Sequence, residues 1–132
     1  VDAIERFVTE PVFDLPKLQP LTERLAVLGD MDGVRLAGPL AKRLANTISF
    51  TVSGTDSMTL LAALDMEGIC ASSGSACSAG SLNPSHVISA MGRRDDEANS
   101  LVRFSLGRDS TSEEVDLVLD RFPKILIRIR SF

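Results

Sequence analysis

The hydrophobic and polar positions of the chain predict short strands that alternate with helices. Two stretches, residues 46–52 and 101–106, alternate apolar and polar side chains, which is typical of strands with one buried face. Elsewhere, apolar residues recur every three or four positions, as they do on an amphipathic helix. The predicted strands are 34–37, 46–52, 69–71 and 101–106. The predicted helices are 18–28, 56–66, 84–91 and 110–129.

This order of elements indicates a single α+β domain over residues 1–132, in which helices cover one face of a small, mainly antiparallel sheet. The strand 101–106 is expected to have one core face and one outward face. The core face holds Val102, Phe104 and Leu106. The outward face holds Leu101, Arg103 and Ser105.

Capping signals mark the ends of two helices. Asp56 or Ser57 is expected to cap the helix 56–66, and Gly68 is expected to end it. The buried side of that helix is predicted to hold Met58, Leu61 and Leu64. The last helix has two possible capping boxes, Ser110 with Glu113 and Thr111 with Glu114. Its predicted apolar stripe is Val115, Val118, Phe122, Ile125 and Ile129, and Pro123 is expected to kink the helix without ending it.

Composition narrows the class of protein. The net charge is −4, which argues against nucleic acid or an anionic membrane as the main partner. No apolar run is long enough to span a bilayer, and no secretory leader is recognised. Two cysteines without an export signal suggest free thiols in the cytoplasm. With His86 as the only histidine, a closed four-ligand zinc site is missing and no metal is expected.

Residues 72–81 consist of Ser, Gly, Ala and a single cysteine, Cys77. Such small side chains bury too little apolar area to offset the entropy of ordering, so a mobile loop is predicted. A thiol in the middle of a tether can collect a group in one place and deliver it in another. The alternative is a Ser/Gly linker with an incidental cysteine.

Two runs of residues carry a family resemblance. The run SSGSACSAGSLNPSHV over residues 72–87 and the run LVRFSLGR over residues 101–108 resemble the cysteine desulfurases, the pyridoxal-phosphate enzymes that supply sulfur for iron–sulfur cluster assembly. The likeness extends more weakly from about Gly33 to the C-terminus, and the first 30 residues match poorly. The resemblance implies the fold of the C-terminal small domain of fold-type-I pyridoxal-phosphate enzymes.

The resemblance also implies roles for individual residues. Cys77 would attack the sulfur of L-cysteine, giving L-alanine and a persulfide that passes to a sulfur-acceptor or iron–sulfur scaffold protein. Arg103 would hold the α-carboxylate of the substrate; the alternative is a structural salt bridge to an Asp or Glu. His86 is a possible supporting residue, although packing near the start of a helix is the favoured interpretation.

Four other positions are noted for their chemistry or for a departure from the family pattern. Cys70 is predicted to be a small buried apolar residue, and Arg108 to be structural. Asn99 stands where the family often has a histidine, and Ala45 where it usually has a proline. The first departure has no predicted effect, and the second puts only a local turn in doubt.

The cofactor residues of the family belong to a larger domain that precedes this one. Lys17, Lys42 and Lys124 are the only lysines here, and none lies in the family's lysine motif. The resemblance therefore implies that the complete enzyme binds pyridoxal phosphate, with the cofactor lysine outside this chain. It also implies that the complete enzyme is a homodimer. Residues 1–30 would be the cut or repacked end of the connection, and the chain alone would be inactive. The alternatives are a stand-alone persulfide carrier that acts in trans and an interaction domain without chemistry.

Overall fold

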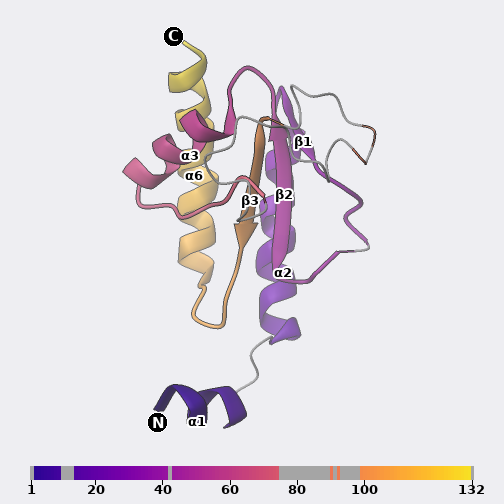
Figure 1. The fold of residues 1–132 in the computed structure, drawn as a ribbon, viewed down its shortest axis with the longest axis vertical. Coiled ribbons are helices and arrows are strands. Elements are labelled where there is room, and N and C mark those ends of the chain that lie inside the picture. The colour runs from indigo at the N-terminus through magenta and orange to yellow at the C-terminus, as the bar shows by residue number, and fades with distance from the viewer. Residues whose placement is uncertain are drawn as a thin grey trace.

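The computed structural model describes residues 2–9, 14–41, 43–74, 90, 92 and 99–131. Figure 1 shows the order of the elements in these residues. They are α1 (Asp2–Thr9), α2 (Leu15–Leu25), the 3-10 helix η1 (Ala26–Asp30), β1 (Val34–Leu36), β2 (Thr47–Val52), α3 (Ser57–Met66), β3 (Leu101–Ser105) and α6 (Ser112–Arg130). None of the helices in these ranges has the length and apolar character needed to cross a bilayer.

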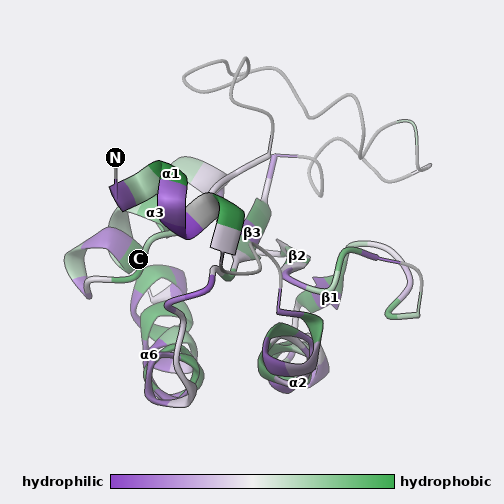
Figure 2. Ribbon diagram, turned by 90° about the horizontal axis from the view of Figure 1, so that it is seen from below, coloured by the Kyte–Doolittle hydropathy of each residue, from purple (hydrophilic) through white to green (hydrophobic). Residues whose placement is uncertain are grey.

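The three strands form one antiparallel sheet in the order β1-β2-β3. Phe50 lies at its centre, opposite Leu36 on one side and Val102 on the other. In the view of Figure 2, α2, α3 and α6 lie on the same side of the sheet. The predicted α+β arrangement with helices on one face is confirmed.

An aromatic row connects the sheet to the last helix. The ring of Phe104 on β3 meets that of Phe50 at 6.4 Å and that of Phe122 on α6 at 6.0 Å, both edge to face. Such pairs add about 0.5–1.5 kcal/mol beyond the burial of their area. Val102 and Leu106 are buried in the same core, as the alternation predicts. Leu101 departs from the prediction, because it is only 5% exposed and packs against Ala37 on the opposite face.

The ends of α3 follow local rules. Asp56 accepts a hydrogen bond from the N–H of Thr59 at 3.0 Å, and this contact lowers the pKa of Asp56. At the other end Gly68 has φ +74°, and the N–H of Ile69 donates to the carbonyl of Leu64 at 3.0 Å. This is a Schellman motif, which favours glycine at the left-handed position.

The predicted buried side of α3 is partly wrong. The buried apolar residues are Leu60, Ala63 and Leu64, while Met58 is 62% exposed and Leu61 is half-buried. Because this helix is apolar on nearly all sides, its spacing does not identify the face that meets the core. Packing against β3 and α6 determines that face.

The helix α6 matches its prediction more closely. Thr111 and Glu114 form the capping box: the N–H of Thr111 donates to the Glu114 carboxylate at 3.0 Å, and the N–H of Glu114 donates to the Thr111 hydroxyl at 3.2 Å. The helix continues through Pro123 to Arg130. All five residues of the predicted stripe join the core or pack against it.

The helix predicted over residues 18–28 begins three residues earlier than expected. Asp14 caps α2 by accepting from the N–H of Lys17, and Pro16 occupies the first turn, so the helix covers Leu15–Leu25 and continues as η1. The segment before it, which proline interrupts, contains α1. Ile4 and Val8 of α1 are largely exposed.

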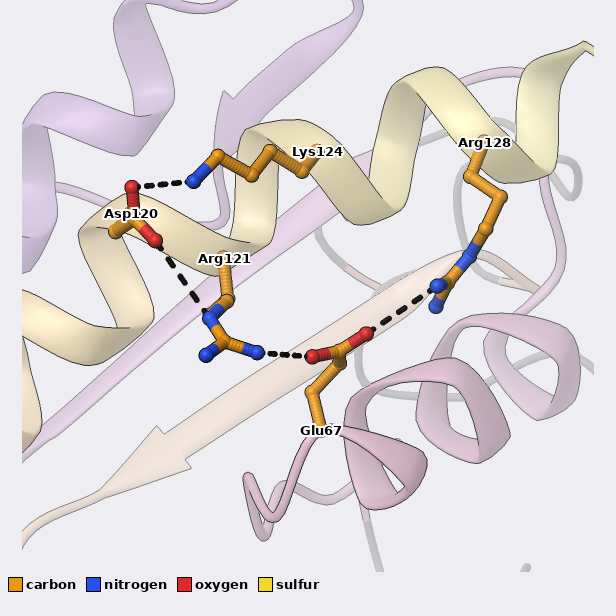
Figure 3. Close-up of polar contacts among 5 residues, drawn as sticks. All are labelled: Glu67, Asp120, Arg121, Lys124 and Arg128. Atoms are coloured by element: carbon orange, nitrogen blue, oxygen red, sulfur yellow. Dashed lines mark hydrogen bonds and ion pairs between the residues drawn. The ribbon is translucent and has the colours of Figure 1, made fainter.

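An ion-pair network joins the end of α3 to α6 (Figure 3). Glu67 accepts from Arg121 and from Arg128, the latter at 3.2 Å. Asp120 accepts from Lys124 at 2.6 Å and pairs with Arg121 at 3.6 Å. The Arg121 hydrogen bond, with that of Arg128, lowers the pKa of Glu67.

We expect Glu67→Gln to flatten the acid limb of the stability curve. Because the folded-state pKa of Glu67 lies below its ordinary value of 4.5, the carboxylate contributes stability above that pH. This contribution is lost as the pH falls through the lower folded-state pKa. Urea unfolding at a series of pH values should show that the variant loses less unfolding free energy than wild type as the pH falls. Asp65→Asn is the control for the change in net charge. Parallel curves for wild type and Glu67→Gln would contradict this.

Arg130 at the end of α6 holds the hairpin of β1 and β2. Its guanidinium donates to the carbonyl of Ser53 at 2.8 and 3.1 Å and to that of Asp32 at 2.9 Å. Gly33 lies beneath it with φ +70°, and a Cβ there would be 2.7 Å from Nη2 of Arg130. The dihedral angle therefore favours glycine at position 33, and an added Cβ would also force the guanidinium of Arg130 to move.

We expect Gly33→Ala to cost about 2 kcal/mol of unfolding free energy, since it combines a left-handed backbone penalty of about 1–2 kcal/mol with loss of Arg130 hydrogen bonds. Gly68→Ala is the matched control, because Gly68 has the similar φ of +74° and nothing within 4 Å of the added Cβ. Urea denaturation should rank Gly33→Ala as the more destabilised. In an Arg130→Ala background the two costs should converge, and an unchanged difference would refute the steric account.

Candidate functional site

The candidate site is built around Arg103 in the middle of β3. Its Cα faces Ser49 of β2, and its backbone polar groups point to the opposite edge of the strand. There the N–H of Arg103 donates to the carbonyl of Ser72 at 2.6 Å, and the N–H of Ser72 donates back at 3.0 Å. This isolated bridge fixes the strand from its second edge.

The guanidinium of Arg103 is only partly satisfied. The side chain is half-buried, and Nη2 donates to the hydroxyl of Ser72 at 3.4 Å. Its Nε is buried and has no hydrogen-bond partner in the described part of the chain. No carboxylate in the described ranges forms an ion pair with it, so the alternative of a structural salt bridge finds no support there. An unsatisfied buried donor on a charged group costs about 1–3 kcal/mol or more, and an anionic ligand would remove that cost.

Ser72 also shapes the chain that follows. Its hydroxyl accepts from the N–H of Gly74 at 3.4 Å and donates to the carbonyl of Gly74 at 3.3 Å. Such local side-chain bonds stabilise a turn. This role was not predicted, because nothing in a run of small polar residues singles out Ser72; only the long-range pairing with β3 does.

The predicted strand 69–71 does not form. The N–H of Ile69 closes the end of α3, and within residues 69–74 only Ser72 forms a bridge to β3. Ile69 is buried in the core, whereas Cys70 is an exposed free thiol. The prediction that Cys70 is buried is wrong, because one helix-capping bond and one bridge leave the residue between them outside the sheet.

Cys70 lines a cleft of about 320 Å³ between the end of β3 and the start of α6. The cleft is lined mostly by apolar side chains, with Ser105, Thr111 and Glu114 among its polar residues. No sequence pattern indicated this cleft, since its walls come from four separate segments.

Cys77 and His86 lie outside the described residues, as do the predicted loop beyond Gly74 and all of the predicted helix 84–91 except residue 90. Their proposed roles stay predictions. Within the described ranges, no group of three or more His, Cys, Asp and Glu residues is placed to hold a metal ion.

The remaining candidates make backbone contacts. Arg108 donates to the carbonyl of Arg6 in α1 at 3.5 Å, which fits a structural role. The carbonyl of Asn99 accepts from both the N–H and the hydroxyl of Ser57 at 2.8 Å, so this residue supports the start of α3. Ala45 adjoins Asn46, whose amide donates to the carbonyl of Leu106 at 3.2 Å.

The described lysines do not form a pyridoxal phosphate site. Lys17 is exposed and donates to the carbonyl of Arg108. Lys124 is exposed and pairs with Asp120. An aldehyde cofactor requires a lysine that is buried or lies beside other cations, and neither residue has that environment. Lys42 lies outside the described ranges, and the described residues do not fit the cofactor.

Comparison with known proteins identifies the class. Residues 17–118 match the family described as aminotransferase class-V, so the chain belongs to that family. The NifS-like protein from Rickettsia africae has a similar structure, with a TM-score of 0.72 and 30% identity; the match covers 84% of this chain and 28% of that one.

Within the family, the chain is similar to cysteine desulfurases, as the two sequence runs indicate. It is 44% identical over 95 residues to the cysteine desulfurase IscS of Clostridium botulinum, covering 70% of this chain and 24% of the relative. It is 35% identical over 131 residues to that of Dictyoglomus turgidum, covering 98% and 33%. The chain thus spans about a quarter to a third of the curated relatives that it matches.

Proposed function

We propose that this chain is the part of a cysteine desulfurase that binds the substrate carboxylate through Arg103 and receives the substrate sulfur on Cys77. The observation that carries the proposal is the buried, unpartnered Nε of Arg103 beside Ser72. Ser72 stands five positions before Cys77 in the chain. A carboxylate can accept two parallel hydrogen bonds from a guanidinium, and L-cysteine carries one.

Chain connectivity limits how far Cys77 can lie from the segment that pairs with Arg103. Gly74 is held beside Ser72, and three residues of fully extended chain span at most about 11 Å. The segment can therefore present a thiol to a substrate whose carboxylate lies on Arg103. The backbone bridge determines where that tether begins.

The chemistry of this chain is then a single sulfur transfer. The Cys77 thiolate attacks the sulfur of L-cysteine, a sulfur–sulfur bond forms, and the carbon–sulfur bond breaks with its electron pair left on the substrate carbon. That carbon takes a proton and leaves as L-alanine. In the complete enzyme, pyridoxal phosphate would stabilise this electron pair, and residues outside the described ranges would hold the cofactor.

Arg103 also distinguishes this function from its alternatives. A persulfide carrier that acts in trans requires only the thiolate, and an interaction domain requires neither group. Neither accounts for a half-buried guanidinium whose buried Nε lacks an acceptor among the described residues. We further propose that the protein acts as a homodimer in the cytoplasm and passes sulfur to a scaffold or other acceptor protein. The chain alone should not desulfurate cysteine.

We expect Cys77→Ser in the complete protein to abolish sulfur transfer while cofactor binding is retained. A serine hydroxyl is not ionised at neutral pH and cannot hold a persulfide. The measurement is the rate of sulfide delivery from cysteine together with the absorbance of the bound cofactor. Cys70→Ser is the matched control and should keep the activity. Normal sulfur delivery by Cys77→Ser would show that the assignment is wrong.

We expect Arg103→Ala to raise the KM for cysteine roughly tenfold to a hundredfold, because hydrogen bonds to charged groups contribute about 1.5–3 kcal/mol. Arg103→Lys keeps the charge but loses the two-donor fork, so its KM should lie between those of the wild type and Arg103→Ala. Steady-state kinetics with cysteine, and with cysteamine as an analogue without the carboxylate, provide the test. A variant that loses as much activity on cysteamine as on cysteine would refute a carboxylate contact.

A further inference from the structure

The backbone N–H and C=O groups of β3 point alternately towards β2 and towards the outer edge of the sheet. The N–H of Leu106 donates to Asn46 at 2.8 Å, and that of Val52 donates to Ser100 at 3.1 Å. In an antiparallel pair the bonded positions alternate, so the even-numbered residues of β3 bond to β2. The backbone groups of the odd-numbered residues point to the other edge.

Partners cover that edge at two of its three positions. The carbonyl of Leu101 accepts from the hydroxyl of Ser57 at 2.9 Å, and Arg103 exchanges two hydrogen bonds with Ser72. For Ser105, no hydrogen bond to its backbone N–H or C=O is present among the described residues. Ser105 is exposed, so the edge is open at this position.

An apolar cleft adjoins the open position. The segment at Ile69 and Cys70 does not continue the pairing that Ser72 begins, and the space between this segment and Ser105 is the cleft of about 320 Å³. Its apolar lining includes Leu25, Ile69, Phe104, Leu106, Val115 and Val118. This volume is at the lower end of the range for ligand sites. The backbone N–H and C=O of Ser105 could pair with one residue of an added strand. The apolar cleft beside them could hold the side chain of a neighbouring residue in that strand.

The geometry points to this cleft as the docking site for an extended peptide segment of the sulfur-acceptor protein, an inference that rests on the proposed function. The segment would pair its backbone with Ser105 and place an apolar side chain in the cleft, as in β-strand addition. Ser105 is two residues from Arg103, about 7 Å along the strand. The acceptor would thus bind beside the place where sulfur is collected. Glu114, the charged residue of the lining, favours a neutral or basic segment.

The first test measures the affinity of the complete protein for a purified iron–sulfur scaffold protein by calorimetry. Ser105→Pro removes an N–H that faces away from β2, so the bonds to that strand remain. We expect its Kd to rise about fivefold, the effect of one hydrogen bond. Ser105→Ala keeps the N–H and should bind normally. Cys70→Phe, which fills the cleft from its rim, should weaken binding, while Cys70→Ala should not.

The second test separates this inference from the proposed function. Alanine formation from cysteine, with dithiothreitol as the sulfur acceptor, should be unchanged in Ser105→Pro and Cys70→Phe. If the wild-type protein forms no alanine, the proposed function fails. If alanine forms normally but the scaffold does not bind, or binds both variants as it binds wild type, the docking site alone is refuted.

The third measurement tests whether another segment of the protein itself pairs with the edge of β3 at Ser105. In the unliganded protein the amide of Ser105 should exchange its hydrogen rapidly compared with that of Phe104, and the scaffold should slow it. Slow exchange without the scaffold would mean that the chain itself occupies the edge, and would overturn the proposal even if the substitutions prevented folding.

Discussion

The two backbone hydrogen bonds between Ser72 and Arg103 are the constraint on which the candidate site depends. They attach the segment that leaves α3 to the middle of β3, whose other edge is bonded to β2. The neighbours of Arg103 in the strand, Val102 and Phe104, are buried in the core. The position of Arg103 is therefore set by packing on both edges of β3, and the same bonds attach the segment that leads on to Cys77.

The sequence predicted well those parts of the fold that local chemistry determines. Alternation located β2 and β3, and a capping box located the start of α6, because a side chain there bonds to a backbone only three residues away. The same logic identified Asp56 and Gly68 at the ends of α3. Arg103 was placed on the outward face for the simple reason that side chains alternate along a strand.

The errors fall where distant segments meet. Leu101 is buried on the outward face by Ala37, and Cys70 is exposed because the chain on either side of it is held by different partners. The spacing of apolar residues in α3 suggested Met58 as a core residue, although the helix turns Leu60 inward. None of these outcomes depends on a neighbour within four positions. The bridge at Ser72 and the cleft beside it arise from contacts that no local pattern encodes.

Arg103 shows how a departure from packing rules can indicate function. An apolar residue at this half-buried position would avoid the cost of a buried Nε without an acceptor, a cost that is a sizeable part of the 5–15 kcal/mol that stabilises a typical domain. Elsewhere in the described part of the chain, α2, α3 and α6 have side-chain caps, and the main core cluster consists of apolar residues. A single unsatisfied charged donor in such a setting favours a bound anion over a packing defect. Under the proposed function, an arginine fixed on the sheet would hold the substrate carboxylate while Cys77, five positions after Ser72 in the sequence, receives the sulfur.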